Sequence, residues 1–156
     1  MIRDPEKVAV LIAQLEKEYV TAQEHLHLNK KAWERIQKGA DDDLDWAALG
    51  YTLNVLYSSI ENYFRRIIKY FDNDLPSESW HKELLDRMQL NLPSIRPALC
   101  DRETAMLCGE LLGFQQVFRT LYDRRLDPER ITLIQKKIPK LSDKFTKAHI
   151  QYRTIS

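Results

Sequence analysis

A helical stretch from Leu111 to Tyr122 carries polar side chains among the apolar residues that would bury it. The apolar residues keep the spacing of one helical stripe: Leu111, Phe114, Phe118 and Leu121. Gln115, Arg119, Thr120 and Tyr122 stand among them. Arg119 follows Gln115 by four residues and precedes Tyr122 by three, so these three share a face on which a guanidinium can bind phosphate. The polar residues are either the solvated flank of an amphipathic helix or a functional surface where two helices or two subunits meet.

A second set of polar residues lies on an otherwise apolar helix upstream. They occupy its other face: Asn54, Ser58, Glu61, Asn62, Arg65, Arg66 and Lys69. Glu61 precedes Arg65 by four residues, a spacing that favours a surface ion pair worth a few tenths of a kcal/mol. His81 follows Trp80 on a short helix, where it would cap, pack or face a cleft. The other candidates for chemistry are Glu61, Arg65 and His81.

Capping residues and apolar spacing predict the elements that position these groups. Five helices are predicted, starting at or near Asp4, Trp46, Trp80, Asp101 and Asp127. Asp-Pro-Glu opens the first and the last, which combines a capping carboxylate with a proline suited to the first helical position. The last helix keeps its spacing through Pro139, so we expect one helix kinked there. The sequence predicts a single all-α domain over residues 1–156, an antiparallel bundle whose long amphipathic faces leave room for a homodimer.

Composition and charge exclude several classes of protein. Of the 156 residues, 44% are hydrophobic and 30% are charged, and only four are glycine. This composition is typical of a helix-rich globular protein and excludes a disordered or all-β chain. The net charge of +1 excludes a general polyanion binder, so any nucleic-acid site has to be a local patch.

Membrane insertion, disulfides and metal binding are not expected. No apolar run approaches the roughly 20 residues that cross a bilayer, and residues 1–5 lack the apolar region of a signal peptide, so we expect a cytoplasmic protein. Cys100 and Cys108 are interpreted as reduced packing residues because a helix between them would keep them apart. No cysteine or histidine spacing suits a metal, and we expect neither a metal nor a cofactor.

Several segments resemble one known protein family. The runs GFQQVFRTLY (113–122) and LDPER (126–130), with ENYFRRI (61–67) and SWHKELL (79–85) upstream, are similar to the HepT-like toxins of the HEPN superfamily. The likeness spans most of residues 45–135. It implies an all-α homodimer and a metal-independent endoribonuclease whose active site forms at the dimer cleft. It also implies a neighbouring MNT-type nucleotidyltransferase antitoxin, which adds AMP to a tyrosine of the family motif.

The family motif is only partly present. It consists of an arginine, four intervening residues, a histidine, one residue and a tyrosine, and these positions hold Gln115, Thr120 and Tyr122. By the resemblance, Tyr122 is the AMP acceptor. Metal-free RNA cleavage needs groups that take and give protons and a cation that stabilises the phosphorane. Threonine does not titrate near neutral pH and glutamine carries no charge. The motif positions therefore favour binding of RNA without cleavage.

Three hypotheses follow. In the first, the chain is a HepT-like toxin-family component that keeps the fold and the dimer but has weak or no ribonuclease activity; its candidate RNA contacts are Arg65, Arg119, Arg124 and Arg125. In the second, it is a non-catalytic, antitoxin-like subunit that binds a nucleotidyltransferase or another HEPN chain. In the third, it is an active ribonuclease with relocated groups: His81 or Tyr122 acts as acid or base, supported by Arg119 and Glu61.

Overall fold

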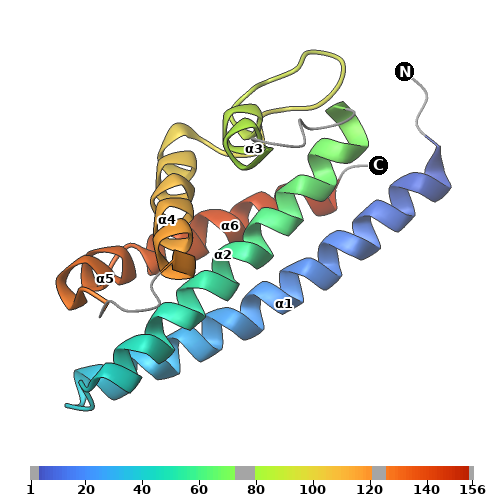
Figure 1. Ribbon diagram of the computed structural model, residues 1–156. Coiled ribbons are helices and arrows are strands. Elements are labelled where there is room, and N and C mark those ends of the chain that lie inside the picture. Colours follow the sequence, from blue (N-terminus) through green and yellow to red (C-terminus); the bar gives the residue numbers. More distant parts are fainter. Residues whose placement is uncertain (1–3, 73–79, 121–125, 155–156) are drawn as a thin grey trace.

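The computed structural model describes residues 4–72, 80–120 and 126–154. All regular elements of this part of the chain are helices, and they lie in one bundle (Figure 1). In chain order they are α1 (Pro5–Gln37), α2 (Asp43–Asp72), α3 (Trp80–Met88), α4 (Arg102–Thr120), α5 (Pro128–Gln135) and α6 (Ile138–Arg153). The two longest, α1 and α2, run antiparallel side by side, and α3, α4 and α5 contact α2 (Figure 1). The predicted all-α antiparallel bundle is confirmed.

The C-terminal helix is bent, as predicted. Its two arms are α5 and α6, and together they complete the predicted five helices. The bend falls at Lys136 and Lys137 rather than at Pro139. Pro139 is the second residue of α6, where the missing N–H would have no partner within the helix. The proline therefore marks the start of the second arm.

Side-chain caps fix the starts of α1, α2 and α5. Asp4 accepts a hydrogen bond from the backbone N–H of Glu6 at 2.9 Å, and Asp127 accepts one from Glu129 at 3.1 Å, as their sequence pattern predicts. The second helix starts at Asp43, three residues before the predicted Trp46. The physical reason is another cap: the Asp42 carboxylate accepts from the backbone N–H of residue 45 at 3.0 Å.

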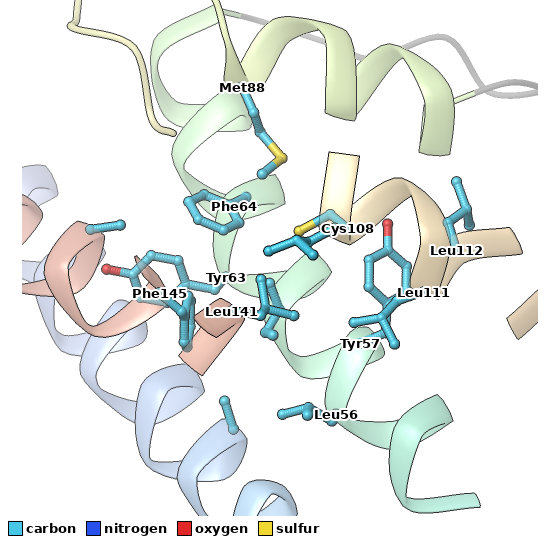
Figure 2. Close-up of a cluster of buried hydrophobic side chains, with 14 of the residues drawn as sticks. Leu56, Tyr57, Tyr63, Phe64, Met88, Cys108, Leu111, Leu112, Leu141 and Phe145 are labelled. Atoms are coloured by element: carbon cyan, nitrogen blue, oxygen red, sulfur yellow. The ribbon is translucent and has the colours of Figure 1, made fainter. Parts of the chain in front are cut away.

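The hydrophobic core lies around α2, which contributes more buried residues than any other described helix. Figure 2 shows side chains from α2, α3, α4 and α6 meeting there. Aromatic rings pack edge to face: Tyr63 lies 4.9 Å and Phe64 5.8 Å from Phe145 of α6, measured between ring centroids. Met88 of α3 and Cys108 of α4 close the cluster. Because α2 is buried on several sides, polar groups on it must find partners within the protein.

A buried pair of amide side chains connects α1 to α5. Asn29 and Gln135 exchange two hydrogen bonds of 2.8 Å each, and Asn29 also donates to the hydroxyl of Thr52 at 3.1 Å. These side chains are at most 6% exposed, so the pair satisfies groups that water does not reach. Three helices, α1, α2 and α5, are thereby held in register.

A buried ion pair anchors the irregular segment between α3 and α4. The side chain of Arg96 is fully buried and makes two hydrogen bonds of 2.7 Å to the carboxylate of Asp72, near the end of α2. Its remaining donors reach the backbone carbonyls of Arg87, Leu90 and Pro97 at 3.0–3.1 Å. The guanidinium therefore stabilises a connection that prolines keep from being helical.

Both cysteines are free and serve packing. Burial raises the pKa of Cys100 to about 12 and also raises the pKa of Cys108, so both thiols stay protonated at neutral pH. In the described residues, no helix combines the length and the apolarity that crossing a bilayer requires.

Candidate functional site

Four polar residues of α2 share one face of the helix. Asn54, Ser58, Glu61 and Arg65 follow one another at intervals of four, three and four residues, the spacing of a single helical stripe. We call them the α2 polar row. Two other helices cover this row: α4 contacts it at Ser58, and α3 contacts it at Glu61 and Arg65. The row is therefore where the candidate residues predicted on separate helices meet.

Gln115, at the arginine position of the motif, is buried against the α2 polar row. Its side chain is 2% exposed. The amide nitrogen donates to the Ser58 hydroxyl at 2.8 Å and to the backbone carbonyl of Asn54 at 3.3 Å. It lies one and two turns beyond Leu111 and Cys108, on the stripe of α4 that faces the core. A neutral and hydrogen-bonded amide therefore occupies this position.

Two other candidate residues of α4, Arg119 and Thr120, are exposed. Thr120 donates its hydroxyl to the carbonyl of Val117, one turn back on the same helix, at 2.9 Å. Arg119 lies one turn beyond Gln115, at the exposed end of α4. Gln115 is therefore buried, whereas Arg119 and Thr120 are exposed at the end of the helix. Tyr122, with Arg124 and Arg125, lies outside the described residues.

Glu61 pairs with His81 instead of forming the surface pair expected with Arg65. The His81 ring nitrogen Nδ1 lies 2.7 Å from Glu61 Oε2. The Glu61 side chain is only 6% exposed, whereas that of His81 is 29% exposed. The four-residue spacing suits an isolated helix, but α3 packs over this face and offers Glu61 a nearer partner. The structure therefore brings together Glu61 and His81, two side chains of the relocated-ribonuclease hypothesis.

The ring of Trp80 contacts both Arg65 and His81. The Arg65 guanidinium carbon lies 4.3 Å from the Trp80 ring centroid, and the imidazole of His81 stacks on that ring at 3.7 Å. The Nε of Arg65 is buried and has no hydrogen-bond partner among the described residues. The first two residues of α3 thus contact the α2 polar row: Trp80 at Arg65 and His81 at Glu61.

Tyr57 lies buried beside the row. It points from α2 toward α4 (Figure 2), is 1% exposed, and its hydroxyl has no hydrogen-bond partner of good geometry in the described part of the chain. Burial, and next the negative charge of Glu61, raise the pKa of the Tyr57 phenol well above its usual range. The phenol therefore stays protonated and can act only as a donor near Glu61.

Sequence reasoning passed over Gly50, which sets how closely α4 approaches α2. A Cβ at Gly50 would lie 3.1 Å from side-chain atoms of both Phe118 and Leu126, tighter than an ordinary van der Waals contact. The glycine therefore makes room for the end of α4, which carries Arg119 and Thr120. The signal was a glycine inside an otherwise regular helical pattern, which helix propensity disfavours.

The comparison with known families agrees with this architecture. Among the described residues, no three histidine, cysteine or acidic side chains are placed to hold a metal ion. Residues 48–155 match the model of a family described as HepT-like protein, a range that takes in most of α2 and all of α3 to α6. No curated protein and no solved structure matches the chain. The match covers well over half of the chain, and the chain therefore belongs to the HepT-like family of the HEPN superfamily.

Proposed function

We propose that this chain is the toxin-type component of a HEPN/MNT toxin–antitoxin pair, acting as a cytoplasmic homodimer that binds RNA with weak or absent cleavage at its motif positions. Membership of the HepT-like family supports the general role. The geometry of Gln115 supports weak or absent cleavage. Its amide is buried and already bonded to Ser58 and Asn54, so it is not a cation facing a substrate.

The chemistry of the motif positions supports binding over turnover. Transesterification of RNA needs a base for the 2′-hydroxyl, an acid for the leaving oxygen and a positive charge near the phosphorane. Position 115 offers a neutral amide, and Thr120 offers a hydroxyl bonded to its own helix. Neither group changes its charge near neutral pH. Arg119, at the end of α4, retains the means to bind phosphate.

Replacing Arg119 with alanine is expected to weaken the binding of single-stranded RNA and to lower its salt dependence. Arg119 is exposed at the end of α4, so its loss removes one phosphate contact and leaves the core unchanged. The slope of log K against log salt concentration should fall by about 0.7. Fluorescence anisotropy of a labelled oligonucleotide at several salt concentrations measures this slope.

Arg35→Ala is the matched control. Arg35 pairs with Asp45 at the start of α2 and is 70% exposed, so its loss removes the same charge from a different part of the surface. It should leave both affinity and slope unchanged. Equal effects of the two substitutions, or no measurable RNA binding by the wild-type protein, would refute the proposed RNA surface.

The outer face of α4 is the proposed homodimer surface. Met106 and Val117 on this face are 59% and 38% exposed, and a Cβ at Gly113 between them would meet no atom within 4 Å. An open face with exposed apolar side chains beside the motif positions is suited to a second copy of the chain.

Arginine at position 113 is therefore expected to yield a folded monomer. The side chain has free space in the protomer, and replacing a helix-interior glycine removes an unfavourable helix propensity of about 1 kcal/mol, so the melting temperature should not fall. Light scattering after size-exclusion chromatography measures the mass. Gly113→Ala should remain dimeric, whereas a dimeric Gly113→Arg or a monomeric wild type counts against this surface.

The proposed partner is an MNT-type nucleotidyltransferase with Tyr122 as its AMP acceptor. The support is the family membership together with the tyrosine at the last motif position. Co-expression with the product of the adjacent gene should give a complex and a mass increase in units of AMP that Tyr122→Phe abolishes. Co-purification without added mass would favour the non-catalytic, antitoxin-like subunit instead.

A further inference from the structure

We propose that the junction of α2 and α3 is a phosphodiester-cleaving subsite in which His81 transfers the proton, Glu61 orients its ring and Arg65 binds the phosphate. The proposal rests on the proposed binding of RNA. It assigns any slow cleavage by the wild-type protein to these groups rather than to positions 115 and 120.

The pairing of His81 with Glu61 suits an acid–base group. Because the carboxylate lies 2.7 Å from Nδ1, the proton of the neutral ring belongs on Nδ1, and Nε2 is left as a proton acceptor. Glu61 is nearly buried, so it keeps its position, whereas the 29% exposure of His81 lets the ring reach solvent. A carboxylate that orients a partly exposed imidazole is the arrangement that general bases use in hydrolytic enzymes.

Arg65 supplies a positive charge one turn beyond Glu61 on α2. Its guanidinium packs on the Trp80 ring, and that ring also stacks with His81. A buried Nε without a hydrogen-bond partner in the described residues leaves a donor for a ligand oxygen. Arginine binds phosphate through several N–H groups in one plane, so a phosphodiester fits this donor.

Several side chains along α2 carry polar atoms without a partner. Among the described residues, four buried side-chain nitrogen or oxygen atoms have no hydrogen-bond partner, and three of them belong to Asn54, Tyr57 and Arg65. Buried polar atoms without partners are rare in proteins and are costly unless another group satisfies them. The Arg65 nitrogen lies where α3 packs on α2, and a polar ligand bound there can accept a hydrogen bond from it.

The proposed step conserves atoms and electrons. The 2′-hydroxyl of the bound nucleotide gives its proton to His81 Nε2, its oxygen bonds to phosphorus, and the bond from phosphorus to the 5′ oxygen breaks. The leaving 5′ oxygen takes a proton from water, and the hydroxide so formed removes the proton from His81. The products are a 2′,3′-cyclic phosphate and a 5′-hydroxyl. One histidine serves where efficient ribonucleases use two proton-transfer groups, so slow turnover is expected.

Single-turnover cleavage of labelled single-stranded RNA tests the role of His81. His81→Asn keeps an amide that can donate to Glu61, and it should lower the cleavage rate by about 10²- to 10⁴-fold without weakening RNA binding. His81→Gly should be as slow, and added imidazole should restore part of its rate. The control His27→Asn changes an exposed histidine of α1 and should behave as wild type.

Substitutions of the two supporting residues separate positioning from binding. Glu61→Gln should lower kcat and leave KM unchanged, because the ring loses its orienting carboxylate while the phosphate contact remains. Arg65→Ala should raise KM, whereas the control Arg35→Ala should not. Asp45, the partner of Arg35, precedes Arg65 by 20 residues on α2. At the rise of a helix this is about 30 Å, which keeps the control away from the proposed subsite.

Each result decides for or against the subsite. Wild-type protein that binds RNA without cutting it overturns the subsite and leaves the proposed function standing, whereas failure to bind RNA overturns both. Cleavage that persists in folded His81→Asn, or a folded His81→Gly that imidazole does not rescue, refutes the role of His81 in proton transfer. Cyclic-phosphate ends that disappear in His81→Asn and return in His81→Gly with imidazole support it.

Discussion

Alanine in place of Arg96 is expected to lower the free energy of unfolding by about 3–5 kcal/mol. The substitution leaves the carboxylate of Asp72, 6% exposed, without the two hydrogen bonds it now accepts. It also removes the donor from three backbone carbonyls of the segment between α3 and α4. An uncompensated buried charge is among the most destabilising changes in a protein. Denaturant unfolding followed by circular dichroism at neutral pH measures the loss.

Two variants separate the charge from the general effect of truncation. Arg87→Ala breaks a partly exposed pair with Glu83, four residues earlier, and should cost only a few tenths of a kcal/mol. The double change of Arg96→Met with Asp72→Leu removes both charges and should recover much of the stability lost in Arg96→Ala. A loss below about 1 kcal/mol in Arg96→Ala would contradict the anchoring role of the pair.

The double substitution of Gln115→Arg with Thr120→His is expected to raise the rate of RNA cleavage by about 10²- to 10⁴-fold. It restores a cation and a titratable imidazole at the family motif positions. Two acceptors on the α2 polar row would orient the new guanidinium: the Ser58 hydroxyl and the side-chain oxygen of Asn54, which has no partner among the described residues. The remaining N–H groups of the arginine would be available to a phosphate. Position 120 is exposed, so the imidazole fits without repacking.

Matched variants show whether the motif positions themselves matter. Gln116→Arg adds the same charge at the exposed neighbouring position and should not raise the rate. Thr120→His alone should give part of the gain, because it supplies a proton-transfer group and leaves the core unchanged. Time courses of RNA cleavage measure the rates, and thermal unfolding checks the fold. A double variant that is folded, dimeric and inert would argue against a degenerate nuclease site.

The sequence was sufficient to predict features that depend on neighbours along the chain. Asp-Pro-Glu at 4–6 and at 127–129 predicted the helix starts because a cap acts within one turn. Apolar spacing predicted the helices, and Pro139 predicted the bend within two residues. The acidic run 41–45 offers several capping carboxylates for the second helix, and Asp42 takes that role, so the helix begins at Asp43, three residues before Trp46.

Features that depend on contacts between helices could not be predicted in the same way. The spacing in α4 left Gln115 either inside or outside, and only its contact with Ser58 places it inside. The four-residue spacing predicted an ion pair between Glu61 and Arg65. Because α3 packs on this face of α2, Glu61 pairs with His81 instead. Arg96 stood in an irregular segment without periodicity, so no pattern marked it as the most buried of the described arginines.

The most direct measurement mixes excess wild-type protein with end-labelled single-stranded RNA and follows anisotropy and cleavage in the same sample. We predict that anisotropy rises on mixing. We also predict that the wild-type protein cuts the RNA at least about 100-fold more slowly than the protein carrying Gln115→Arg and Thr120→His. Wild-type protein that cuts the RNA as fast as that restored variant would contradict the claim that a buried, neutral Gln115 leaves the motif without catalytic power.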